Sequence, residues 1–192
     1  MRRIAIWPTL LALLFALVTS SVRGQTTAAK SPGKSEDNRS SSLSREIHHQ
    51  ILVLPFYSVF DSIDFTLEGR KVTLTGQVLR HTLKENAEGA VKNIEGVAVV
   101  VNHIEVLPTS PTDDDLRRAV YRSLYEDPTL ARYAVQNMPS VHIIVKNGGV
   151  ALEGSVESVS DRNAAGARVA AVPNVAGIKN DLVVRSKEIA AE

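Results

Sequence analysis

The sequence predicts an α+β protein made of two copies of an α-β-β-α-β unit, each a three-stranded mixed sheet with two helices on one face. Three observations support this prediction. The chain repeats itself at a spacing of 78 residues, each repeat contains paired runs of alternating apolar residues, and segments of helical periodicity flank those runs. A hairpin followed by a right-handed crossover through a helix adds a parallel third strand, which makes the sheet mixed.

The repeat is visible when residues 62–106 are placed over residues 140–184 without a gap. Eleven of these 45 positions are identical, whereas background composition gives roughly three. Gly76 and Gly154 are one identical pair, at positions where a side chain would otherwise point inward. We interpret both glycines as a β-bulge or as a close approach of the following helix. The two halves are therefore predicted to be copies of one fold.

Residues 1–24 have the order of regions typical of a signal peptide. Two arginines are followed by an apolar run over residues 4–18 and then by small residues up to Gly24. We expect cleavage after Gly24, or after Ser20 or Ser21, and export to the periplasm; an uncleaved membrane anchor is the alternative. Because the chain contains no cysteine, it offers no acceptor for a lipoprotein anchor.

Residues 25–42 are rich in Ser, Thr, Ala and charged residues and contain no large apolar side chain, so we predict a flexible linker. The first unit is predicted to occupy residues 43–107 and the second residues 112–185. Residues 186–192 then form a C-terminal tail.

Each unit is predicted to begin with a helix, continue through a hairpin and a second helix, and end in a third strand. Helical spacing of apolar residues indicates the helices, and strict alternation indicates half-buried strands. Thr112 is the predicted cap of the helix that opens the second unit, and the following aspartates favour its N-terminus. The predicted elements are helix 43–51, strands 63–67 and 72–78, helix 83–94 and strand 97–107, then helix 116–124, strands 141–145 and 150–156, helix 160–172 starting at Ser160 and Asp161, and strand 175–185.

Composition and motifs exclude several functions. With 44% hydrophobic and 22% charged residues and a net charge of +1, the chain is neither collagen-like nor wholly disordered, and bulk charge gives no reason to expect nucleic-acid binding. The sequence contains no Gly-x-Ser-x-Gly, no His-Glu-x-x-His and no phosphate-binding glycine loop. The five histidines are scattered. We therefore predict no enzymatic activity, no cofactor and no metal site.

Two runs in each half carry a resemblance to a known family. They are residues 71–78 and 94–102 in the first half, and residues 149–156 and 173–180 in the second. These runs resemble the BON (bacterial OsmY and nodulation) domain. The resemblance implies a non-enzymatic module of the bacterial envelope that attaches to phospholipid or brings partners to the membrane. Two copies in an exported chain are most similar to the osmotically inducible periplasmic member of the family.

Residues 117–133 combine arginines with tyrosines. Tyrosine has an apolar ring with a polar tip, and arginine extends its charge on a long apolar stem, so together they suit the surface of an anionic membrane. The alternative is that the tyrosines line the core and the arginines offset nearby carboxylates. The predicted lipid-binding residues are Arg117, Arg118, Tyr121, Arg122, Tyr125, Arg132 and Tyr133.

The last strand of the first unit is apolar on both faces. Val99 and Val101 lie where the second unit has Gly177 and Lys179. We interpret Val99 and Val101 as a contact with the second unit or, alternatively, as a surface for another protein. The leading hypothesis is a periplasmic protein that binds a phospholipid surface and supports envelope integrity or osmotic-stress tolerance. The alternative is an adaptor that docks an envelope protein or self-associates without lipid affinity; the sequence does not indicate an oligomeric state.

Overall fold

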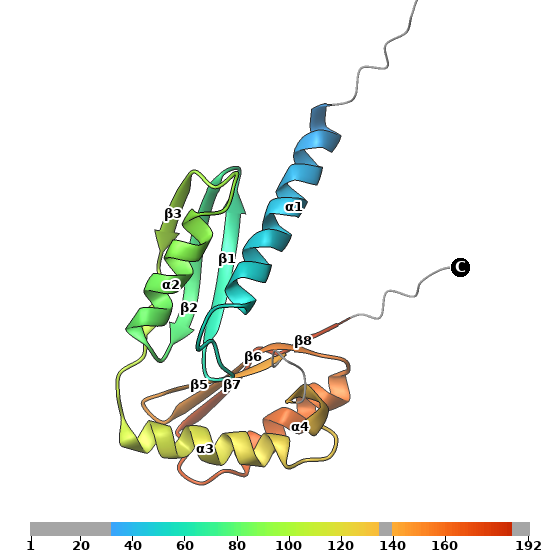
Figure 1. Ribbon diagram of the computed structural model, residues 1–192. Helices are drawn as coiled ribbons and strands as arrows, with labels where there is room; N and C mark the ends of the chain where they lie inside the picture. The colour runs from blue at the N-terminus through green and yellow to red at the C-terminus, as the bar shows by residue number, and fades with distance from the viewer. Residues whose placement is uncertain (1–31, 135–139, 186–192) are drawn as a thin grey trace, which may run out of the picture.

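The computed structural model describes residues 32–134 and 140–185, and it contains two units, each with its own sheet and pair of helices (Figure 1). The predicted signal peptide and C-terminal tail lie outside the described residues. The first unit consists of α1 (Pro32–Leu52), β1 (Ser62–Glu68), β2 (Lys71–Val78), α2 (His81–Lys92), β3 (Val99–Asn102) and β4 (Glu105–Val106). The second consists of α3 (Pro111–Tyr125), the 3-10 helix η1 (Ala131–Tyr133), β5 (Val141–Lys146), β6 (Gly149–Val156), α4 (Val159–Ala170), β7 (Gly177–Asn180) and β8 (Val183–Val184).

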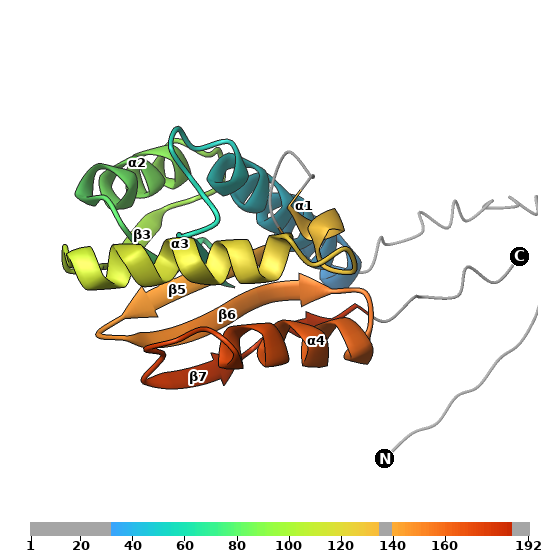
Figure 2. The ribbon, with the colours of Figure 1, turned by 90° about the horizontal axis from the view of Figure 1, so that it is seen from below.

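Both sheets have the predicted mixed topology. β1 and β2 form an antiparallel hairpin in which Phe65 lies opposite Leu74, and β3 runs parallel to β2. The second unit repeats this arrangement with β5, β6 and β7. Figure 2 shows α3 and α4 side by side on one face of the second sheet. The predicted α+β fold of two repeated units is confirmed.

The third strand of each sheet is broken into two short pieces. β3 and β4 both run parallel to β2, and β7 and β8 both run parallel to β6. At the break in the first unit, the Asn102 side chain accepts a hydrogen bond from the Ile104 N–H (3.1 Å) and donates one to the Lys84 carbonyl of α2 (3.0 Å). Asn180 makes the equivalent two bonds in the second unit. The continuous last strand predicted for each unit is therefore wrong, because an asparagine side chain interrupts it.

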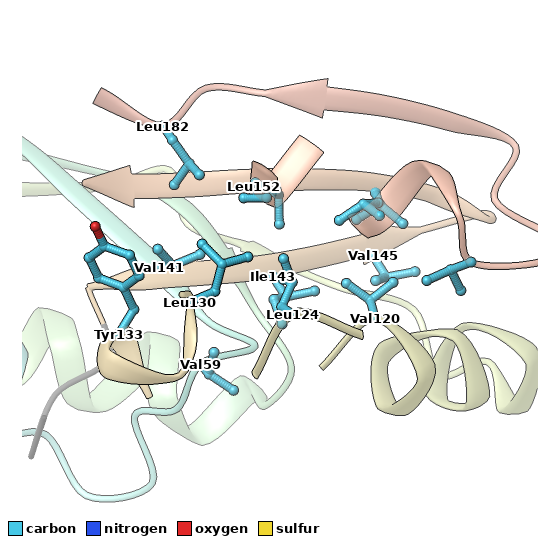
Figure 3. Close-up of a cluster of buried hydrophobic side chains, with 14 of the residues drawn as sticks. Val59, Val120, Leu124, Leu130, Tyr133, Val141, Ile143, Val145, Leu152 and Leu182 are labelled. Carbon is cyan, nitrogen blue, oxygen red and sulfur yellow. The ribbon is translucent and has the colours of Figure 1, made fainter. Parts of the chain in front are cut away.

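Each unit has a separate hydrophobic core between its helices and its sheet. In the first core, Ile47 of α1 and Leu83 of α2 are fully buried against Leu74 of β2. In the second, Val120 of α3 packs among the side chains of the strands, as Figure 3 shows. The apolar faces that the periodicity predicted for the helices are therefore the buried ones.

The helix α1 begins at Pro32, so the prediction of a flexible linker over residues 25–42 is wrong from Pro32 onward. The composition predicts that this stretch has no apolar side chain to bury, and residues 37–42 are exposed, in agreement with that prediction. The composition did not exclude a helix. Because the apolar second half of α1 is anchored on the sheet, the polar first half gains one hydrogen bond for each residue added without a new nucleation cost.

Gly76 and Gly154 are required by the neighbouring strand. Both have positive φ, +116° and +105°. A Cβ at Gly76 would lie 2.2 Å from the Ser62 carbonyl oxygen, and a Cβ at Gly154 would lie 2.2 Å from the Ser140 carbonyl oxygen. Strand pairing reaches both glycines without an extra residue, so the predicted bulge and the predicted approach of the following helix are both wrong. These positions are glycine because the backbone of the partner strand occupies the space of a side chain.

The loop 53–61, which joins α1 to β1, lies against the second unit (Figure 1). Its Val59 carbonyl accepts a hydrogen bond from the Ile143 N–H of β5 (2.7 Å), and the Val59 side chain lies in the second core (Figure 3). An ion pair between Glu105 of β4 and Lys146 of β5 adds a contact, with a nitrogen–oxygen distance of 2.6 Å. The expected packing of one unit against the other is therefore present, and the loop 53–61 takes part in it.

Candidate functional site

The N-terminus of α3 is tied to the hairpin of the second sheet. Ser110, and not the predicted Thr112, caps this helix, and its Oγ accepts the Asp113 N–H at 3.2 Å. Asp113 is buried, and its two carboxylate oxygens accept the N–H groups of Asn147 and Gly148, each at 2.9 Å. Asp113 therefore serves as a clamp that joins helix to turn.

Arg117 is also part of the interior. Its side chain is 4% exposed, donates to the Val145 carbonyl at 2.7 Å and pairs with Asp114 at 2.5 Å. A buried guanidinium needs such partners, because an unpaired buried charge would cost several kcal/mol. Arg117 is therefore removed from the predicted lipid-binding set, since its charge cannot reach a membrane surface.

Tyr133 and Arg132 meet at a buried carboxylate. The Tyr133 hydroxyl donates to Asp161 of α4 at 2.7 Å and accepts the Glu157 N–H at 2.9 Å. Arg132 pairs with the same Asp161 oxygen at 2.5 Å. Burial raises the pKa of Asp161, but hydrogen bonds from Tyr133, Ser158 and Arg132 outweigh that effect and lower the pKa below its usual value. This arrangement holds η1 against the start of α4.

The structure therefore separates the predicted lipid-binding residues into two groups. Tyr133 is 2% exposed and is removed from the set, together with Arg117. Arg132 is half exposed, but its charge is already paired with carboxylates of the second unit. For these residues the alternative interpretation, core edge and internal ion pairs, describes what the structure shows. The exposed side of α3 is what remains.

Three aromatic rings form a group where the two units meet. Phe60 of the loop 53–61 lies with its ring centroid 6.0 Å from that of Tyr121, and Tyr121 meets Tyr125 edge-on at 4.8 Å. Tyr125 donates its hydroxyl proton to the Val141 carbonyl at 2.9 Å, and burial raises the pKa of its phenol. Tyr121 is 40% exposed. Sequence reasoning found the two tyrosines and missed Phe60, which belongs to the other unit.

The exposed arginines of α3 lie beside this aromatic group. Arg118 and Arg122 are both exposed, and Tyr121 lies between them in the chain and on the same side of α3, because residues three and four apart share a helix face. Arg118 forms a surface ion pair with Asp115, and both of these side chains are mostly exposed. We call Arg118, Tyr121 and Arg122 the α3 patch. It presents one aromatic ring and two guanidinium groups to solvent, and the guanidinium of Arg118 also pairs with the exposed Asp115.

The first unit has a groove between α1, the β1–β2 turn and the end of α2. Its volume is about 1240 Å³. Arg39 and Arg70 line it together with Asp37, Glu46 and Glu95, so its charges are mixed. Within residues 32–134 and 140–185, no three histidine or acidic side chains gather in a way that could hold a metal ion.

Val99 and Val101 lie on the face of the first sheet that the helices leave open. They pair with Lys71 and Thr73 of β2, whereas the residues that alternate with these, Val72 among them, are buried. Val99 is 52% exposed, so the second unit does not cover it. The interpretation of Val99 as an inter-unit contact is therefore wrong, whereas that of the half-buried Val101, and a surface for another protein, stay predictions.

The protein is a tandem repeat of one α+β unit, and its second unit carries internal ion pairs and the exposed α3 patch. The BON domain pattern matches residues 59–108 and 112–186, so the chain belongs to the BON-domain family and has two such domains in tandem. BON domains are in general non-catalytic and are linked to membrane or phospholipid interaction and to stress.

No curated protein matches the chain. Among solved structures, the chain is similar to CdsD, a structural protein of the type III secretion system of Chlamydia trachomatis, with 15% identity and a TM-score of 0.29 over 77% of this chain and 94% of that one. A C-terminal domain of CdsD is similar at 14% identity and a TM-score of 0.27, over 75% of this chain and 98% of that one. None of the helices within the described ranges is both long and apolar enough to cross a bilayer.

Proposed function

We propose that this protein is exported to the periplasm and binds an anionic phospholipid surface through the α3 patch, as a non-enzymatic envelope protein that supports envelope integrity or osmotic-stress tolerance. The general link of BON domains to membranes supports the proposal. The observation that carries it is the exposure of Arg118, Tyr121 and Arg122 on one side of α3.

The chemistry of the α3 patch suits a headgroup layer. Each arginine near an anionic membrane surface contributes about 1 kcal/mol, and the contribution falls with salt. Tyr121 can place its partly exposed ring at the boundary between headgroups and acyl chains, and its contacts with the rings of Phe60 and Tyr125 hold it in position. Lipid contact is thus expected to depend on both charge and the ring.

The test is co-sedimentation of residues 25–192, which contain every described element, with vesicles of phosphatidylglycerol and phosphatidylcholine. The double variant Arg118→Gln and Arg122→Gln should bind roughly 30-fold more weakly at low salt, because about 2 kcal/mol of attraction is lost. The control removes the same charge elsewhere, through Lys92→Gln and Arg162→Gln on exposed sites of α2 and α4. Equal binding by the two double variants would contradict the proposal.

Export is tested separately. If the chain is processed as proposed, the mass of the protein recovered from the periplasm corresponds to a chain that begins at Gln25. Recovery of the unprocessed chain in the membrane fraction would instead support the uncleaved anchor.

A docking role is the second candidate function, and exposed Val99 on the open face of the first sheet favours it. Val99→Ser should then reduce capture of an envelope protein while vesicle binding stays unchanged. The two candidate functions are distinguished by the assay that fails: vesicle binding by the α3 double variant, or capture of an envelope protein by Val99→Ser.

A further inference from the structure

The loop 53–61 contains a turn with an unusual residue at its tip. The Tyr57 N–H donates to the Leu54 carbonyl at 3.2 Å, which closes a four-residue turn with Pro55 at the second position. Phe56, at the third position, has φ of +68°. A proline followed by a residue of positive φ is the pattern of a type II turn, in which glycine or asparagine is the usual third residue.

Phe56 is an exception among the described residues. The other residues with positive φ that are not glycine are Asn147 and Asn174, and asparagine tolerates this conformation. A phenylalanine in the same conformation is strained. Strain of this kind at an exposed site is an observation from which a function can be inferred.

Packing does not explain the choice of phenylalanine. Phe56 is 70% exposed, and Val53, three residues earlier, is 50% exposed. The neighbouring residues Val59 and Phe60 of the same loop do pack, against the second unit. The loop therefore keeps two apolar side chains in solvent while it buries others.

A positive charge accompanies the exposed ring. The Arg80 guanidinium lies 5.0 Å from the centroid of the Phe56 ring. An aromatic ring with an arginine beside it matches the boundary of an anionic bilayer, where the ring enters the apolar layer and the guanidinium meets a phosphate. The pairing of charge with ring thus favours a lipid surface as the occupant of this site.

We propose that Phe56 and Val53 insert into the headgroup boundary of an anionic lipid bilayer, with Arg80 on a lipid phosphate, as a second membrane contact separate from the α3 patch. This inference rests on the proposed function. The two contacts are linked, since the loop that carries Phe56 also places Phe60 against Tyr121.

A tryptophan reporter tests the insertion. The only tryptophan of the chain is Trp7, so residues 25–192 contain none, and Phe56→Trp creates a single reporter. On phosphatidylglycerol vesicles its emission should shift to the blue and be quenched by lipids brominated in the acyl chains. The control reporter is Val159→Trp, at an exposed position at the start of α4, and its emission should not change.

The outcomes separate the two proposals. If the protein sediments with vesicles but the reporter at position 56 does not respond, the insertion is overturned and the α3 contact stands. If both reporters respond equally, adsorption is general and the insertion is again overturned. If no variant sediments, both proposals fail.

A second variant guards against loss of folding. Phe56→Asn suits the backbone and should unfold at the same or a higher urea concentration, while its affinity for vesicles falls about tenfold or more. Unchanged affinity in this variant would overturn the insertion.

Discussion

Removal of the Asp113 carboxylate should destabilise the second unit more than removal of the exposed carboxylate of Asp115. The side chain is buried and accepts two backbone N–H groups at 2.9 Å each. A hydrogen bond to a charged group contributes about 1.5 kcal/mol or more, so Asp113→Ala should lower the free energy of unfolding by about 3 kcal/mol. Asp113→Asn retains a single acceptor oxygen and should lose about half of that.

The matched control is Asp115→Ala. Asp115 lies two residues away in the same helical turn, but its side chain is 76% exposed and pairs with Arg118 at the surface. Such a pair contributes less than about 1 kcal/mol. Urea unfolding followed by circular dichroism measures the difference, and hydrogen exchange of the Asn147 and Gly148 amides locates it. Equal destabilisation by both variants, or unchanged exchange of these two amides, would refute the assignment of Asp113 as a clamp.

Two further predictions concern a glycine and a histidine. In urea unfolding, Gly154→Ala should lower the free energy of unfolding by more than about 2 kcal/mol. Gly89→Ala, where an added Cβ on α2 meets open space, should raise it by about 0.5–1 kcal/mol. Similar effects of the two substitutions would contradict the steric argument. Burial lowers the pKa of His142, which lies near Tyr57, Asp61 and Glu153, so the unfolded state binds the proton more readily. The contribution of neutral His142 to the free energy of unfolding should therefore be fully present above pH 6.5 and decrease as the pH falls below that value. His142→Gln should make the free energy of unfolding less dependent on pH in this range.

Periodicity and repetition predicted most of the fold. The alternation in the hairpins and the helical spacing of residues such as Ile47 and Val120 correspond to the observed cores. These signals are local, so sequence alone is enough to find them. The break in the third strand was not predicted, because it depends on the Asn102 side chain reaching across to α2.

The candidate site was only partly predictable. A run of arginines and tyrosines pointed to α3, but sequence did not show that Arg117 is buried, since arginine is seldom found inside a protein. Its partner, the Val145 carbonyl, is 28 residues away. Phe60 and Phe56 lie in the other repeat, and their roles follow from the path of the loop 53–61.

Val59 has a consequence for how the two halves can be separated. It precedes the strands of the first repeat in sequence, yet its side chain completes the core of the second, and its carbonyl covers the edge of β5. A fragment cut between the repeats would leave a hole under α3 and an open strand edge, which is a starting point for aggregation. The two repeats are thus no longer equivalent. The second repeat depends on a residue that precedes the strands of the first, so dividing the chain between them does not give two complete domains.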